Sequence, residues 1–238
     1  MPRMARFVAE GYPHHITQRG NRRQIVFEDR EDRRVYLDLL QNYAAKHKLR
    51  IWAWCLMTNH IHLLAVPPSA NALARTLGST HRDYSRYRNI RAGVTGCLWQ
   101  ARYYSCAVDA PGVWQVMAYI ERNPVRGGLA DTAEDYPWSS ARAHVNDVSD
   151  KLVDIAHWRE FYTPERWRET LRIGVEEEAL GERIRLATMT GRPFGSLDFT
   201  AELEAAAQRK LSPQRRGRRR ESQAREIAEE QLVLRIGE

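Results

Sequence analysis

The apolar residues in the first part of the chain follow two patterns, which take turns along the sequence. Short apolar runs closed by turn residues are typical of β-strands. The predicted strands are residues 12–18, 49–57, 60–66 and 103–108. Longer segments with apolar residues three or four positions apart predict amphipathic helices. These helices are residues 29–48, 70–89 and 111–123. The resulting order predicts the α+β class, with a ferredoxin-like split βαβ sheet and an added helix.

The same patterns predict which helical side chains are buried. The core candidates of helix 29–48 are Val35, Leu39 and Tyr43, with Leu40 one step aside. Those of helix 70–89 are Leu73, Leu77 and Tyr84. His81 falls among charged residues of helix 70–89, so we expect it to be solvated.

The part of the chain after residue 145 has a different character. A charged helical segment covers 166–186, a Gly/Pro-containing break covers 188–195, and Ser196 is a suitable cap for a further helix. We therefore predict a first domain, residues 1–145, and a helical basic C-terminal extension, residues 146–238. The extension carries an arginine cluster at Arg215, Arg216, Arg218 and Arg219. Such a cluster is typical of DNA binding, although a solubilising tail is the alternative.

The overall charge narrows the choice of partners. The 37 Lys and Arg outnumber the 30 Asp and Glu, which gives a formal charge of +7. A chain of this charge attracts polyanions, chiefly nucleic acid or an anionic membrane. We expect no membrane association, because no apolar run is as long as a spanning helix. Three scattered cysteines form no disulfide or zinc pattern, which favours the cytoplasm.

The strongest candidate for metal chemistry is a histidine pair in the strand 60–66. His60 and His62 are two positions apart, so both imidazoles point to one face and can reach one metal ion. Ile61 and Leu63 point the other way, toward a core. The alternative is that the pair is simply half-exposed on an open sheet. Of His14 and His15, at most one can share that face.

The candidate nucleophile lies on the helix 111–123. Asp109 and Pro111 form a suitable helix start. Tyr119 and Asn123 are four positions apart, so their side chains are neighbours near the helix end. The alternative is a tyrosine at the edge of the core. Tyr103 and Tyr104 are rival candidates; with Trp99 and Arg102 nearby they suit base stacking or sheet packing.

Four motifs occur in order: MTNHIHLL at 57–64, LWQARYYS at 98–105, YIERNPVR at 119–126 and YPWSS at 136–140. Together they closely resemble the REP-associated tyrosine transposases, which belong to the single-tyrosine HUH transposases of bacterial insertion sequences. The resemblance covers about residues 12–144 and is highly specific. A weaker similarity continues through TGRPFGS at 190–196 and the arginine-rich stretch.

This resemblance implies a site and a reaction. His60 and His62 would bind a divalent ion, Mg²⁺ or Mn²⁺, and Tyr119 would be the nucleophile. Insertion-sequence relatives have a metal-binding glutamine four residues after the tyrosine; here that position is Asn123, whose carboxamide oxygen is also a suitable donor. The implied substrate is single-stranded DNA folded into a hairpin. The implied intermediate is a 5′-phosphotyrosine with a free 3′-hydroxyl, and no nucleotide cofactor is needed.

Basic residues would hold the DNA backbone without reading its sequence. The candidates in the first domain are Arg19, Arg22, Arg23, Arg102 and Arg122. Arg122 or the metal would also help Tyr119 to ionise. For any single arginine the alternative is a solvated basic face.

Other functions are compatible with parts of this pattern. A protein of the same descent could bind repeat hairpins without cutting them. A metal hydrolase using an activated water would form no covalent adduct and would tolerate Tyr119→Phe. An RNA-binding split βαβ module is less consistent, because the strand 60–66 lacks stacking aromatics. The sequence leaves open whether the protein is a monomer or a homodimer.

Overall fold

The computed structural model describes residues 7–153, 155–173 and 177–212. Within them, four antiparallel strands form one sheet in the order β2-β3-β1-β4. The strands are β1 His14–Arg19, β2 Arg50–Leu56, β3 His60–Val66 and β4 Tyr104–Ala107. The helices are η1 Asn21–Arg23, α1 Arg30–Lys46, α2 Ala72–Ala92, α3 Ala110–Glu121, α4 Asn123–Arg126, α5 Ala141–Asn146, α6 Ile155–Arg159, α7 Pro164–Ile173, α8 Glu177–Thr190 and α9 Leu197–Ala207. The antiparallel sheet with its intervening helices confirms the predicted α+β ferredoxin-like fold.

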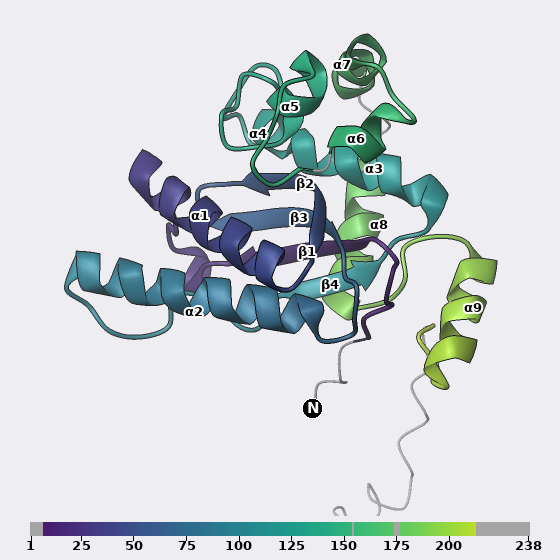
Figure 1. Ribbon diagram of the computed structural model, residues 1–238, viewed down its shortest axis with the longest axis horizontal. Helices are drawn as coiled ribbons and strands as arrows, with labels where there is room; N and C mark the ends of the chain where they lie inside the picture. Colours follow the sequence, from purple (N-terminus) through teal and green to yellow (C-terminus); the bar gives the residue numbers. More distant parts are fainter. Residues whose placement is uncertain (1–6, 154, 174–176, 213–238) are drawn as a thin grey trace, which may run out of the picture.

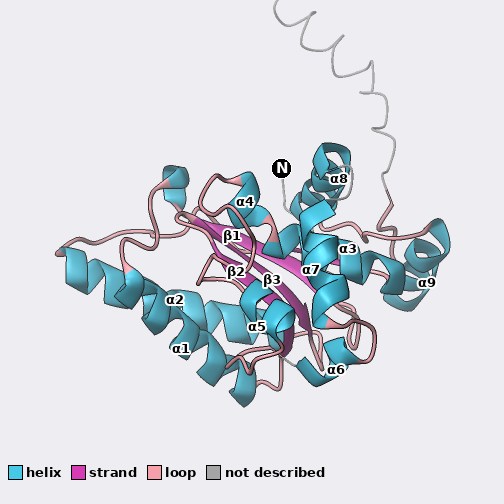
Figure 2. Ribbon diagram, turned by 90° about the horizontal axis from the view of Figure 1, so that it is seen from above, coloured by secondary structure: helices cyan, strands magenta, loops and turns pink. Residues whose placement is uncertain are grey.

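Helices cover both faces of the sheet (Figures 1 and 2). Helices α1 and α2 lie together on one face. On the other side, α3 contacts β2 and β3, while α8 contacts β1 and β4. Ile16, Ile61 and Leu63 are fully buried in the core. Polar side chains can therefore occupy the sheet face under α3 and α8.

The buried stripe of α1 differs from the prediction by one position. Its buried residues are Asp32, Tyr36, Leu40 and Ala44, whereas Val35, Leu39 and Tyr43 are only partly buried. The physical reason is a polar anchor: the carboxylate of Asp32 forms ion pairs with Arg88 and Arg91 of α2. A buried charge needs such partners, so this contact between α1 and α2 turns Asp32 inward.

In α2, Leu73, Leu77 and Tyr84 are buried as predicted. The expectation that His81 is solvated is wrong. His81 is only 8% exposed, and its Nε2 lies 3.0 Å from the Tyr36 hydroxyl. A hydrogen bond from a neighbouring helix compensates for its burial, and a charged helix sequence does not reveal that partner.

The helix that carries Tyr119 begins as predicted and ends earlier. The Asp109 side chain caps α3 by accepting from the Gly112 amide at 2.8 Å. Helix α3 ends at Glu121, two residues before the predicted end, and Asn123 begins the short helix α4. Tyr119 and Asn123 therefore belong to consecutive helices, α3 and α4.

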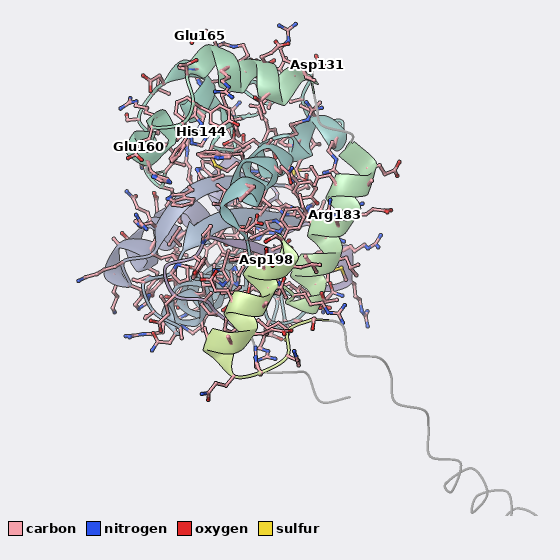
Figure 3. The ribbon with its side chains drawn as sticks, turned by 90° about the vertical axis from the view of Figure 1, so that its right-hand side faces the viewer. Asp131, His144, Glu160, Glu165, Arg183 and Asp198 are labelled. Carbon is pink, nitrogen blue, oxygen red and sulfur yellow. The ribbon has the colours of Figure 1, made fainter. Side chains whose placement is uncertain are left out.

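The described part of the second half packs on the first. The predicted helix 166–186 is divided between α7 and α8, and the short helices α5 and α6 were not predicted. Trp158, Trp167 and Leu171 join the main core, so the boundary at residue 145 stays a prediction. Ser196 caps α9 as predicted, through a hydrogen bond from the Phe199 amide. Figure 3 shows α8 and α9, marked by Arg183 and Asp198, lying against the body of the protein.

Two further predictions concern the arginine cluster and the membrane. The cluster Arg215, Arg216, Arg218 and Arg219 lies outside the described residues. Among the described helices, none has the length and apolar character needed to cross a membrane.

Candidate active site

Strand pairing places the polar candidates on one face of the sheet. Thr17 of β1 lies opposite His62 of β3, and Arg19 lies opposite His60. Side chains of directly paired residues share a face, and so do residues two apart on one strand. His15 therefore also lies on this face, while His14 points to the other. This confirms that only one of the two adjacent histidines joins the site.

The two imidazoles of β3 lie close together. The ring centroids of His60 and His62 are 5.0 Å apart. His60 Nδ1 lies 2.7 Å from Asn59 Oδ1, and the amide nitrogen of Asn59 donates to the Arg23 carbonyl at 3.1 Å. Because an amide oxygen can only accept, His60 carries its proton on Nδ1. Its Nε2 lone pair is then available for a ligand.

His62 is more deeply buried, at 5% exposure, and contacts a third histidine. His62 Nδ1 lies 3.0 Å from His15 Nε2, and the two rings stack with centroids 5.2 Å apart. On its other side, His15 Nδ1 lies 2.6 Å from the Thr188 hydroxyl of α8. A chain of three polar side chains thus runs from β3 through β1 to α8.

Tyr119 meets these histidines from α3. Its side chain is 8% exposed, and its ring lies edge-on to His62 and His15, with centroid distances of 5.7 and 5.8 Å. The Arg126 guanidinium lies 4.8 Å from the centre of the Tyr119 ring. Tyr119 therefore contacts two histidines and one cation.

Asn123 is oriented by the end of α3. Its amide nitrogen donates to the carbonyls of Tyr119, at 2.8 Å, and Ile120, at 3.3 Å. Because carbonyls only accept, the nitrogen must be the atom on that side. The amide oxygen is then left for another partner.

These side chains line a common cavity of about 360 Å³. It is lined by His15, Thr17, Arg19, Met57, His60, His62, Gln100, Tyr104, Tyr119, Asn123, Arg126, Gly127, Arg185, Thr188 and Met189. The cavity joins residues from β1, β3, β4, α3, α4 and α8. Its size and mixed lining suit a nucleotide-sized ligand.

Burial keeps the histidines neutral. Desolvation lowers the pKa of His60 to about 4, with a further contribution from Arg19. It lowers the pKa of His15 to about 3 and that of His62 well below its ordinary value. Neutral imidazole is the form that binds a metal cation.

The donor set fits a divalent ion only if the carboxamide takes part. No group of three His, Cys, Asp or Glu side chains that could hold a metal occurs among the residues with described positions. His60 and His62 offer two imidazole nitrogens, and Asn123 adds an amide oxygen to the same cavity. Two nitrogens and one oxygen suit Mn²⁺, and they suit Mg²⁺ when water and phosphate complete its shell.

The predicted arginines occupy different places. Arg19 lines the cavity, and Arg22, Arg23 and Arg102 are exposed. Arg122 does not line this cavity; its guanidinium donates to the Leu171 carbonyl. Arg122 also lines a smaller hollow together with Tyr119 and Arg126, so its assistance to Tyr119 stays a prediction.

Several cavity residues were not identified from the sequence. Arg126, one turn beyond Arg122, supplies the cation at Tyr119, and Thr188 and Arg185 come from α8. In the sequence, only the spacing between Tyr119 and Arg126 could have indicated that these two side chains lie together. Nothing in the local pattern of α8 indicates that it returns to the sheet.

Of the rival tyrosines, Tyr104 lines the cavity and Tyr103 is buried outside it. Trp99 is buried against Tyr36 and His81, so it packs in the core and is not a free stacking platform.

Comparisons with known proteins identify one family model and two similar structures. Residues 8–123 match the family model "Transposase IS200 like", and that segment includes His60, His62, Tyr119 and Asn123. This match over residues 8–123 confirms the resemblance seen in the sequence.

Two solved structures are similar. A REP-associated tyrosine transposase bound to a REP hairpin aligns with a TM-score of 0.51 and 19% identity, over 64% of this chain and 90% of that chain. A protein described as a transposase of Deinococcus radiodurans R1 aligns with a TM-score of 0.36 and 23% identity, over 51% of this chain and 97% of that chain. No curated protein matches the sequence.

Proposed function

We propose that this protein is a metal-dependent transposase that cleaves and rejoins single-stranded hairpin DNA through a covalent bond between Tyr119 and a 5′-phosphate. The observation that carries the proposal is that strand β3 and helices α3 and α4 direct their candidate side chains into one cavity. The Tyr119 ring lies 5.7 Å from that of His62, and His60 and Asn123 line the same space. A nucleophile beside two neutral imidazoles and an amide oxygen suits metal-assisted phosphoryl transfer.

The reaction needs two balanced transfers. In the first, the Tyr119 oxygen forms a bond to phosphorus, and the bond from phosphorus to the 3′-oxygen breaks. The leaving oxygen takes a proton and becomes a 3′-hydroxyl, while the 5′-phosphate stays on the tyrosine. In the second, a 3′-hydroxyl attacks the same phosphorus and releases the phenol. The bond energy is retained, so no nucleotide cofactor is required.

The basic side chains of the cavity have distinct roles in this proposal. Arg126, 4.8 Å from the centre of the Tyr119 ring, would stabilise the negative charge that develops at the reacting oxygens during the transfer. Arg19 and Arg185 line the cavity and would neutralise phosphates on either side of the reacting bond. The exposed Arg22, Arg23 and Arg102 would contact the DNA backbone beyond the cavity. The arginine cluster 215–219 is proposed to extend that contact.

His60, His62 and Asn123 would hold the divalent ion. When bound, Mg²⁺ or Mn²⁺ would neutralise the charge of the scissile phosphate and polarise its phosphorus. The protein contributes two nitrogens kept neutral by burial and an amide whose orientation is fixed by α3.

The decisive experiment uses hairpin DNA labelled at one end, because the structural neighbour was solved with a REP hairpin. Purified full-length protein is incubated with Mn²⁺ or Mg²⁺ and hairpins with different flanking sequences. Products are separated on a denaturing gel. A 3′ label should stay on the protein, whereas a 5′ label should leave on a fragment with a free 3′-hydroxyl.

Matched variants identify the nucleophile. Tyr119→Phe should abolish the adduct, and a chelator should do the same to the wild type. Tyr104→Phe is the control, because Tyr104 lines the same cavity. An adduct that survives Tyr119→Phe would overturn the assignment. Release of both labels with no adduct would indicate a hydrolase, and tight binding without cleavage would indicate a hairpin-binding protein.

A further inference from the structure

The hydroxyl of Thr188 is one of the most enclosed polar groups near the cavity. Thr188 is 1% exposed and lies on α8, outside the segment that matches the transposase family. Its Oγ1 lies 2.6 Å from His15 Nδ1, 2.7 Å from the Ile184 carbonyl oxygen and 3.4 Å from Cys106 Sγ. Each of these contacts is short enough to contain a hydrogen bond.

The proton on each bond can be assigned from elementary chemistry. The Ile184 carbonyl cannot donate, so the single hydroxyl proton of Thr188 must point to it. The contact with His15 then needs a proton from His15 Nδ1. A neutral imidazole carries one N–H, so His15 Nε2 has a lone pair and can only accept.

The assignment continues to His62. His15 Nε2 lies 3.0 Å from His62 Nδ1. Because His15 Nε2 accepts, His62 Nδ1 must carry the proton. His62 Nε2 is therefore unprotonated, as a metal-binding nitrogen must be.

We propose that Thr188 and His15 form a positioning relay that fixes the tautomer and ring orientation of His62 for metal binding. The inference rests on the proposed role of His62 as a metal ligand. His15 itself is not a ligand, because both of its ring nitrogens are engaged, one by Thr188 and one by His62. The relay makes α8 part of the metal site without contacting the metal.

Removal of the Thr188 hydroxyl should move the ring protons of His15 and His62 from Nδ1 to Nε2. In Thr188→Val the buried Nδ1–H of His15 loses its acceptor. His15 then places its proton on Nε2, donates to His62 Nδ1, and leaves the His62 proton on Nε2. That proton blocks metal binding, so Mn²⁺ should bind about 10- to 100-fold more weakly, as for other losses of a partner behind a metal-binding histidine. Thr188→Ser keeps the hydroxyl and should behave as the wild type.

Two measurements on the full-length chain test the relay. Long-range ¹H–¹⁵N NMR of histidine-labelled, metal-free protein reports which nitrogen of His15 and His62 is protonated. Titration with Mn²⁺ alone, followed by electron paramagnetic resonance, reports the dissociation constant. We expect Nδ1–H on both histidines in the wild type and in Thr188→Ser, and Nε2–H on both in Thr188→Val.

The outcomes separate the relay from the proposed function. Nε2–H on His62 of the wild type would overturn the relay even if Thr188→Val failed to fold. Retention of Nδ1–H and of wild-type Mn²⁺ affinity in Thr188→Val would also overturn it. If the wild type shows the expected tautomers but binds no Mn²⁺, the hydrogen-bond relay is confirmed. The proposed role of His62 as a metal ligand is then wrong.

Discussion

Glu121 ties the helix of the candidate nucleophile to the C-terminal helices, and its replacement gives a quantitative test. It lies two residues after Tyr119 and is 0% exposed. Its Oε1 accepts hydrogen bonds from Ser140 at 2.5 Å and lies 2.6 Å from His144 Nδ1. Its Oε2 accepts from the Trp167 indole of α7 at 2.8 Å. Figure 3 shows His144 inside this helical layer, while Glu165 lies at its outer edge.

The change Glu121→Gln keeps the shape but replaces one acceptor by a donor. Gln Oε1 can still serve Ser140 and His144, so the new amide N–H₂ faces the Trp167 N–H. Two buried donors then lack acceptors, at about 1–3 kcal/mol each, partly offset because a buried charge is removed. We expect a net loss of about 2–4 kcal/mol from a stability that is typically about 5–15 kcal/mol.

Urea unfolding followed by circular dichroism measures this loss. The control is Glu169→Gln on the same α7, because Glu169 is exposed and should change stability by less than about 0.5 kcal/mol. If Glu121→Gln unfolds at the same urea concentration as the control, the buried network does not hold α3 to α7. A shift of the expected size would also show that residues beyond 145 stabilise the first domain.

Three further predictions concern the pKa of His81, the space around Gly20 and the charge of Arg126. Burial lowers the pKa of His81 to about 3, below its unfolded value, so its contribution to stability is present above about pH 6.5 and is lost as pH falls. His81→Gln should therefore lose about 2 kcal/mol less than the wild type between pH 7 and pH 5 in urea titrations. A Cβ at Gly20 would lie 2.5 Å from the Gln24 carbonyl oxygen, so Gly20→Ala should cost about 1–3 kcal/mol. The control Gly78→Ala, in open space on α2, should gain about 0.5–1 kcal/mol. Arg126→Gln should slow adduct formation about 3- to 30-fold, with Arg126→Lys intermediate.

Clear results would contradict each of these three. Equal pH slopes for His81→Gln and the wild type would mean that His81 is not held neutral. Equal signs for the two glycine variants would contradict the crowding at Gly20. An unchanged adduct rate in Arg126→Gln, measured with excess hairpin, would remove Arg126 from the activation of Tyr119.

The sequence by itself determined the features that depend on local geometry. The alternation of strand side chains placed His60 and His62 on one face and Ile61 and Leu63 in the core, and β3 has the predicted ends. Residues separated by one or two positions have a relative direction that only the strand conformation sets. Helix starts at Asp109 and Ser196 were predictable for the same reason, since a cap bonds to an amide three residues away.

Tertiary structure alone decided which of several possible faces was buried. Helix α1 has apolar residues on more than one side, and the pairing of Asp32 with α2 selected the stripe with Tyr36 and Leu40. His81 is buried because Tyr36 reaches it from the neighbouring helix.

The candidate site shows the same division. Strand and helix periods placed the two histidines on one face and Tyr119 beside Asn123, but the contact of Arg126 with the Tyr119 ring appears only in the folded chain. The hydrogen bond between His15 and Thr188 joins residues 173 positions apart. No local period carries information over that distance, because such contacts exist only once the helices have packed on the sheet.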